Sequence, residues 1–98
     1  MAYKIVIKKR FTNKVKKVLS HLETEWSHKV ADEFLNKIDR RIELLSAQTY
    51  IGATSSKVKE VRGLLITRHN RIYYKIKNDQ VIILNMYDTR MQPDKNPY

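Results

Sequence analysis

The fold is decided by residues 62–90, which read RGLLITRHNRIYYKIKNDQVIILNMYDTR. This stretch holds three runs rich in β-branched and aromatic residues, separated by short polar breaks at His69-Asn70 and Asn78-Asp79. Runs of this composition, bounded by such residues, are typical of antiparallel strands joined by tight hairpins. We therefore expect a three-stranded meander over residues 61–90.

The middle run shows the clearest alternation of side chains. Ile72, Tyr74 and Ile76 alternate with a mostly basic set, which consists of Arg71, Tyr73, Lys75 and Lys77. Because successive side chains of a strand point to opposite faces, this pattern predicts one apolar face and one basic face. The third run, residues 81–87, is apolar on both faces until Asn85, which predicts a strand covered on both sides for most of its length.

Length and composition limit what surrounds this sheet. A chain of 98 residues predicts one domain, residues 1–98, with one modest core. Its 42% hydrophobic and 31% charged residues favour a globular protein over a disordered one. No apolar run approaches the roughly 20 residues of a membrane span, and the N-terminus lacks the apolar segment of a signal peptide. With no cysteine there is no disulfide or thiolate chemistry, and we expect a cytoplasmic protein.

The charge is the most informative global property. Twenty Lys and Arg against ten Asp and Glu give a formal net charge of +10, and the pI is about 9.9. A field of this sign favours nucleic acid or an acidic protein as partner. The alternative is a solvated surface that serves only solubility.

The first half of the chain predicts a strand and a helical hairpin. Residues 1–10 hold a short β-branched run flanked by lysines, which indicates a strand at the sheet edge or joining the sheet from outside. A hairpin is expected over residues 12–46, with Thr12 and Ser27 as the N-caps of its two helices. The apolar stripe of the first helix is Val15, Val18, Leu19 and Leu22, and that of the second is Val30, Phe34, Ile38 and Ile42.

These elements give the order β-α-α-β-β-β and an α+β fold, in which an antiparallel sheet packs against the α-helical hairpin. We expect Ile72, Tyr74 and Ile76 to face the hairpin. We expect the helix residues that contact them to be Leu19, Phe34 and Ile38. Residues 48–56 form the expected loop, with Gly52 as its turn residue. The two prolines of residues 91–98 predict a short tail without helix or strand.

Chemical motifs are few. Two glycines exclude a glycine-rich phosphate loop. His21, His28 and His69 lie in no recognised zinc spacing, so we expect no metal and no cofactor. No Ser-His-Asp arrangement is evident.

A basic set around the meander is the candidate site for a target or a nucleic acid: Lys57, Lys59, Arg62, Arg68, Arg71 and Arg90. Guanidinium groups bind phosphate in a forked geometry, and nearby tyrosines such as Tyr73 and Tyr87 can stack on exposed bases. In a meander Arg68, Arg71 and Arg90 fall at the same end of the sheet, so we expect them to converge. The alternative is that each is a strand-end charge that limits edge aggregation.

Trp26 lies between the two predicted helices. We expect it to fill the core or the hinge at the tip of the hairpin. The alternative is a partner-binding role, since tryptophan is enriched at interfaces.

The element order resembles that of the RelE/ParE superfamily, the toxins of type II toxin-antitoxin modules, often called plasmid stabilisation proteins. Three segments carry the resemblance: HLETEWSHKVADEFLNKIDRRIELLS, RGLLITRHNRIYYKI and VIILNMYDTRMQP. Its most specific parts are the Glu25-Trp26 turn, the Arg-x-x-Tyr pattern from Arg71 to Tyr74, and Arg90 after the last strand. Together they extend over nearly the whole chain.

This resemblance implies a compact sheet on a helical hairpin, neutralised by an antitoxin that wraps the toxin with an acidic segment. RelE-like members cleave mRNA in the ribosomal A site with basic residues, several of them on the sheet. ParE-like members keep the fold, lack that catalytic set and inhibit DNA gyrase. The Glu-Trp turn favours the ParE-like side.

Carried over residue by residue, Arg71 and Arg90 match two arginines of the RelE-like pattern, and Arg68 would be the third basic residue of such a site. The paired lysines of that pattern are replaced by residues 64–67, LLIT, and the tyrosine after the last strand has only Tyr98 as a counterpart. We therefore expect a ParE-like toxin that inhibits gyrase and has no firm catalytic residue. The alternatives are a RelE-like ribosome-dependent endonuclease, which would be an enzyme, and a non-toxic basic nucleic-acid-binding module.

Overall fold

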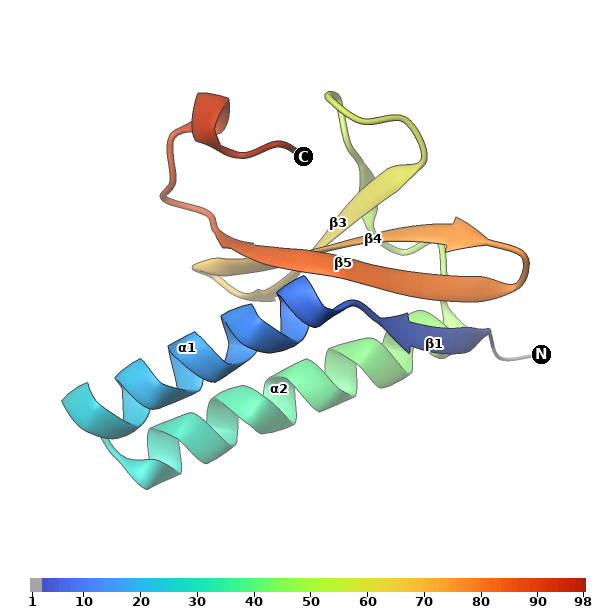
Figure 1. Ribbon diagram of the computed structural model, residues 1–98. Helices are drawn as coiled ribbons and strands as arrows, with labels where there is room; N and C mark the ends of the chain where they lie inside the picture. Colours follow the sequence, from blue (N-terminus) through green and yellow to red (C-terminus); the bar gives the residue numbers. More distant parts are fainter. Residues whose placement is uncertain (1–2) are drawn as a thin grey trace.

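The structure of the chain is a computed structural model that describes residues 3–98. Two helices, α1 (Lys9–Glu25) and α2 (His28–Ala47), form a hairpin that covers one face of a five-stranded sheet (Figure 1). The strands are β1 (Lys4–Ile7), β2 (Ala53–Thr54), β3 (Val61–Thr67), β4 (Asn70–Lys77) and β5 (Gln80–Asp88), followed by a short 3-10 helix η1 (Pro93–Lys95). The predicted α+β fold, a sheet packed on a helical hairpin, is confirmed. Met1 and Ala2, the start of the expected strand range 1–10, lie outside the described residues.

The sheet has the strand order β1-β5-β4-β3-β2. β3, β4 and β5 form the expected antiparallel meander. β1 lies at the edge, as expected, but it pairs with β5 in parallel, with Ile5 opposite Val81. The sheet is therefore mixed rather than purely antiparallel. No tight turn joins β1 to β5, because the whole hairpin and three strands intervene, so the connection does not impose an antiparallel direction.

The two turns of the meander follow the polar breaks. Asn78 and Asp79 have φ angles of 51° and 60°, the left-handed conformation that a two-residue type I′ hairpin requires. The other turn falls at Arg68 and His69, one residue before the expected break, because Asn70 already begins β4. Both hairpins of the prediction are thus present.

The core lies between the sheet and the hairpin, in the predicted register. Ile72 and Tyr74 of β4 are completely buried and share one cluster with Phe34 and Ile38 of α2. Leu19 and Ile76 are partly buried and pack against the same cluster. The expected facing of the meander toward the hairpin is confirmed.

The first helix begins earlier than the sequence pattern suggests. Its N-cap is Lys8, which makes no side-chain capping bond, and Thr12 lies inside the first turn rather than before it. Phe11, only 3% exposed, anchors that turn in the core, which explains why packing overrides the capping preference. Ser27 caps α2 as predicted, because its Oγ accepts a hydrogen bond from the Val30 amide at 3.2 Å.

Two segments expected to lack regular structure have some. The predicted loop 48–56 contains β2, which pairs with the start of β3. Residues 91–98 contain η1 and return across the sheet on the side opposite the helices (Figure 1). No helix within residues 3–98 has the length and apolar character needed to span a membrane.

Candidate functional site

The face of the sheet that the hairpin leaves uncovered is called here the helix-distal face, and it is formed by Gly63, Leu65, Arg71, Tyr73 and Tyr87. Gly63 pairs with Tyr73, and Arg71 pairs with both Leu65 and Tyr87, so these side chains share one face. A Cβ atom at Gly63 would lie 2.9 Å from Cδ of Arg71 and 3.2 Å from Cε1 of Tyr73. Glycine therefore allows the arginine and the tyrosine to lie flat over β3.

Three tyrosines gather on the helix-distal face. Tyr98 stacks on Tyr73 with the ring centroids 5.1 Å apart and the planes at 21°. Tyr87 contacts both rings, at centroid distances of 6.2 Å from Tyr73 and 6.0 Å from Tyr98. The ammonium of Lys14, from α1, lies 4.8 Å from the centroid of the Tyr87 ring. These distances are within the range of favourable aromatic and cation–π contacts.

Polar contacts hold residues 91–98 in this position. Lys57 Nζ donates to the carbonyl oxygens of Pro93 and of Asn96, the latter at 2.6 Å. Ser55 Oγ donates to the Tyr98 carbonyl, and Asn96 Nδ2 donates to the Tyr73 hydroxyl at 3.0 Å. Residues 91–98 were expected to form a short tail without helix or strand, but they contain η1. Partners more than 20 residues away hold the segment in place.

A hollow of about 240 Å³ lies among these groups. Its lining comes from the sheet, the following turn and residues 91–98: Lys57, Arg71, Tyr73, Tyr87, Asp88, Thr89, Met91, Pro93, Asn96 and Tyr98. A guanidinium can bind an anion in a forked geometry, and tyrosine rings can stack on planar groups. The hollow thus combines the guanidinium of Arg71, the ammonium of Lys57 and three tyrosine rings at one place on the surface.

The six candidate cations do not form one cluster. Lys57 and Arg71 line the same hollow. Arg62 lies on the other face, where its Nη1 donates to the carbonyl oxygens of Tyr50 at 3.2 Å and Gly52 at 2.8 Å. Its guanidinium is thereby used within the fold. Lys59 is exposed in the turn before β3.

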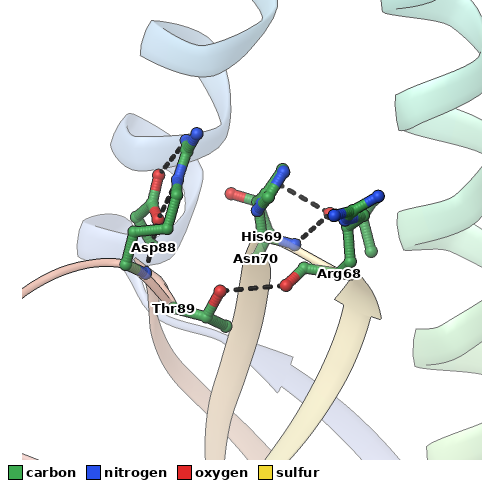
Figure 2. Close-up of polar contacts among 7 residues, drawn as sticks. Arg68, His69, Asn70, Asp88 and Thr89 are labelled. Atoms are coloured by element: carbon green, nitrogen blue, oxygen red, sulfur yellow. Dashed lines mark hydrogen bonds and ion pairs between the residues drawn. The ribbon is translucent and has the colours of Figure 1, made fainter.

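Arg68 and Arg90 do come to the same end of the sheet, where Figure 2 shows Arg68 next to Thr89, the residue before Arg90. Thr89 Oγ1 donates to the Arg68 carbonyl at 2.9 Å, which joins the turn after β3 to the residues after β5. Arg90, however, is bound by Asp88 through a 2.6 Å ion pair between Nη2 and Oδ2. Hydrogen bonding from Arg90 lowers the pKa of the Asp88 carboxyl to about 2. The backbone at Arg68 and the backbone just before Arg90 therefore lie next to each other. The Arg90 guanidinium, however, is bound by Asp88.

Trp26 does not fill the core or the hinge. It is 71% exposed at the tip of the hairpin, so the expectation of a buried plug is wrong. The tip is closed instead by the backbone, where the amides of Trp26 and Ser27 both bond to the Leu22 carbonyl. Its partner-binding role stays a prediction.

Sequence reasoning missed the return of Tyr98 and Asn96 to the helix-distal face. No local signal marks it, because the contacts depend on Lys57 and Tyr73 far away in the chain. Within residues 3–98 no three His, Cys, Asp or Glu side chains are grouped so as to hold a metal ion.

Comparison with known proteins gives one family match and several similar structures. Residues 5–93 match the model of the ParE toxin of the type II toxin-antitoxin system parDE. A chain of the chromosomal ParDE system from P. aeruginosa aligns with a TM-score of 0.77 and 17% identity, covering 89% of this chain and 96% of that one. No curated protein sequence matches.

Two further structures share the fold. A chain of the E. coli DinJ-YafQ toxin-antitoxin complex aligns with a TM-score of 0.60 and 14% identity, covering 90% of this chain and 93% of that one. The isolated E. coli RelE toxin aligns with a TM-score of 0.58 and 12% identity, covering 96% and 92%. At such identities the similarity shows a common fold.

Proposed function

Because the chain belongs to the ParE toxin family of type II toxin-antitoxin systems, we propose that it inhibits DNA gyrase and that a cognate antitoxin neutralises it. The observation that carries this proposal is the family match over residues 5–93. The helix-distal face adds support of its own, since its charges suit an RNA-cleaving site poorly.

Two features, one on that face and one just after β5, argue against cleavage. At the β3 positions of this face stand Gly63 and Leu65, which supply no cation for a scissile phosphate. Arg90, the second arginine of the RelE-like pattern, is paired with Asp88. β3 thus offers no positive charge on this face, and the charge of Arg90 is paired. Such a site would stabilise the negative charge that develops on a reacting phosphate only weakly.

An antitoxin partner is supported by charge. The formal net charge of +10 favours an acidic protein, and opposite charges speed association. The similar structures include a toxin-antitoxin complex, DinJ-YafQ. We infer that this chain is neutralised by the product of a neighbouring reading frame.

One observation favours a second function, ribosome-dependent mRNA cleavage. Arg71 shares a hollow with Tyr73, Tyr87 and Tyr98, and such a set can hold a phosphate beside a stacked base. Tyr98, which returns to this hollow, then takes the place of the tyrosine expected after the last strand.

The two functions are separated by two assays with the purified chain. We expect inhibition of gyrase supercoiling on relaxed plasmid, and no cleavage of mRNA on programmed ribosomes. Discrete A-site cuts that vanish with Arg71→Ala but persist with Lys59→Ala would establish the endonuclease and overturn the gyrase proposal. Lys59 is a suitable control because it is exposed and does not line the hollow.

A further inference from the structure

Residues 91–98 are called here the strap, because they return from the end of β5 across the helix-distal face (Figure 1). The backbone hydrogen bonds of the strap are local. The Met91 amide donates to the Asp88 carbonyl, and the others close the turn of η1. Within residues 3–98, no strand pairs with the strap. The strap can therefore lift from the sheet without breaking any bond of the strand ladder.

Three residues outside the strap hold it through their side chains. Ser55 Oγ donates to the Tyr98 carbonyl, and Lys57 Nζ donates to two carbonyl oxygens of the strap. The Tyr73 hydroxyl accepts a hydrogen bond from Asn96 Nδ2 at 3.0 Å, and the Tyr73 ring stacks on that of Tyr98. The strap is thus held by a few side-chain contacts, which are lost and regained more readily than a strand pairing.

The ammonium of Lys57 has only uncharged acceptors in this arrangement. Lys57 is exposed, and no carboxylate of residues 3–98 lies within 4.0 Å of its Nζ. Hydrogen bonds from an ammonium to an anion are stronger than those to a neutral carbonyl. An anionic group that approaches the hollow therefore competes with the strap for Lys57.

The part of the helix-distal face at the strap is polar. Arg71, Tyr73 and Tyr87 line the hollow. Asn85 lies opposite Tyr73 on β5 and is only 6% exposed. Its Oδ1 accepts from the Met86 amide at 2.8 Å, whereas its Nδ2 has only a 3.5 Å contact with the Tyr87 hydroxyl. Burial of an amide with so weak an acceptor is unfavourable, and a permanent cover favours apolar side chains beneath it. This polar surface therefore indicates a cover that can be removed.

The strap also occupies the groups that suit recognition best. Tyr98 covers one side of the Tyr73 ring, with the two planes at 21°. Asn96 uses the Tyr73 hydroxyl, and the strap carbonyls use the ammonium of Lys57. With the strap in place, a partner finds neither that side of the ring nor these two polar groups available.

We propose that the strap is an autoinhibitory cover, and that gyrase binds the surface around Arg71 and Tyr73 only after the strap lifts. Lys57 couples the two events, because an acidic surface of the target takes this ammonium from the strap carbonyls. This inference rests on the proposed function, which supplies gyrase as the target.

The test holds the strap closed with a chemical bridge. The chain contains no cysteine, so Ser55→Cys with Pro97→Cys introduces the only two thiols. Pro97 is exposed and precedes Tyr98, whose carbonyl contacts Ser55. A short bismaleimide joins the two thiols within one chain. The matched control is the same double variant with both thiols capped by N-ethylmaleimide, which differs only in the bridge.

The first measurement asks whether the strap opens, and it does not depend on any target. Tetranitromethane nitrates accessible tyrosines, and peptide mass spectrometry reads the rate at each one. Nitration of Tyr73 is expected to be slower by about tenfold or more in the bridged protein than in the capped one. Tyr50 is 60% exposed and serves as the internal reference, with an unchanged rate.

The second measurement is inhibition of gyrase supercoiling on relaxed plasmid. The bridged protein is expected to inhibit about tenfold more weakly than the capped one, or worse. The capped protein is expected to inhibit at least as strongly as the intact chain, because loss of the Ser55 hydrogen bond loosens the strap. A capped protein about tenfold weaker than the intact chain would show that the strap takes part in inhibition, and would overturn the inference.

The remaining outcomes separate the inference from the proposed function. If the bridge leaves nitration of Tyr73 unchanged, the strap is not a movable cover and the inference is wrong whatever happens with gyrase. If the bridged and capped proteins inhibit supercoiling equally, the inference is wrong while the proposed function stands. If nitration slows but not even the intact chain inhibits supercoiling, the proposed function fails, and gyrase binding under the strap fails with it.

Discussion

Asp88 holds the guanidinium of Arg90 through two side-chain hydrogen bonds, with 3.0 Å between Nε and Oδ1 and 2.6 Å between Nη2 and Oδ2. The Arg90 amide adds a third bond to the same carboxylate at 2.8 Å. A residue that sequence comparison marks as a binding arginine is thus engaged by a neighbour two positions earlier. The pair is exposed to solvent, with 66% of the Arg90 side chain accessible, so its contribution to stability is small.

The first prediction concerns the titration of Asp88. Its pKa of about 2 reflects, above all, the hydrogen bond from the Arg90 side chain. Carboxyl-detected NMR should therefore show a midpoint near 2 in the intact chain, and a midpoint near the ordinary value of about 3.9 in Arg90→Gln. Because the folded pKa is lowered, the pair stabilises the fold fully above about pH 4 and loses this effect as the pH falls toward 2. An unchanged midpoint in the variant would show that the pair is absent in solution.

The second prediction concerns toxicity. Arg90→Ala should weaken growth arrest only modestly, within about threefold in the inducer concentration needed, because an ion pair this exposed contributes little to the stability of the fold. Arg71→Ala gives the comparison, since Arg71 lines the hollow and packs over Gly63. Circular dichroism checks that both variants fold. Complete loss of arrest in Arg90→Ala alone would mean that its guanidinium leaves Asp88 to contact the target.

The sequence predicts the meander and the hairpin well because both depend on local rules. The alternation from Arg71 to Lys77, the Asn78-Asp79 turn and the Ser27 cap each follow from residues a few positions apart. The parallel pairing of β1 with β5 and the stacking of Tyr98 on Tyr73 depend on contacts between distant segments. No local pattern of the sequence predicts such contacts.

The candidate site shows the same division between local and distant information. The meander correctly brings Arg68 and Arg90 to one end of the sheet. The sequence does not reveal that the Arg62 side chain lies on the face of the sheet that the helices cover. Its direction depends on the register of β3 and β4, which places Arg62 opposite the buried Tyr74. Gly52 was expected to serve a turn, yet its φ is not positive. Glycine is required there because a Cβ would lie 2.6 Å from the Tyr74 hydroxyl and 2.8 Å from the Gly63 carbonyl oxygen.

The third prediction tests the buried hydroxyl of Tyr74. It accepts a hydrogen bond from the Gly52 amide and donates one to the Thr49 carbonyl, both at 2.9 Å. Tyr74→Phe should lower the free energy of unfolding by about 1–3 kcal/mol in urea titrations, because two buried backbone groups lose their partner. Tyr87→Phe is the control, since the Tyr87 hydroxyl has only a 3.5 Å contact with Asn85. A cost below about 0.5 kcal/mol for Tyr74→Phe would mean that water replaces the hydroxyl.

Tyr74 should also resist ionisation. Burial raises the pKa of its phenol above the ordinary value of about 10. The unfolded phenol ionises at a lower pH than the folded one, so deprotonation of Tyr74 should coincide with alkaline unfolding of the chain. The absorbance of tyrosinate from Tyr74 should therefore rise together with the loss of the far-UV circular dichroism of the fold.

The fourth prediction concerns the segment 91–98. Tyr98 stacks on Tyr73 at 5.1 Å, and aromatic pairs of this kind contribute about 0.5–1.5 kcal/mol beyond the area they bury. A double-mutant cycle with Tyr73→Ala and Tyr98→Ala, measured by urea unfolding, should give a coupling energy in that range. Tyr98 paired with the distant Tyr50 serves as the control and should give additive effects. A coupling near zero for the first pair would show that the segment does not pack on the sheet in solution.

The last prediction concerns Trp26, which is the one tryptophan of the chain. At 71% exposure it has little to lose on truncation, so Trp26→Ala should change the free energy of unfolding by less than about 0.5 kcal/mol. If Trp26 binds a partner, the same substitution should weaken that interaction strongly, since exposed tryptophans that become buried dominate many interfaces. A fluorotryptophan incorporated into this chain alone reports on it by fluorine NMR, free and with either gyrase or the antitoxin. A shift with one of them identifies the surface, whereas unchanged spectra with both and unchanged binding by Trp26→Ala would leave Trp26 without a role in recognition of either protein.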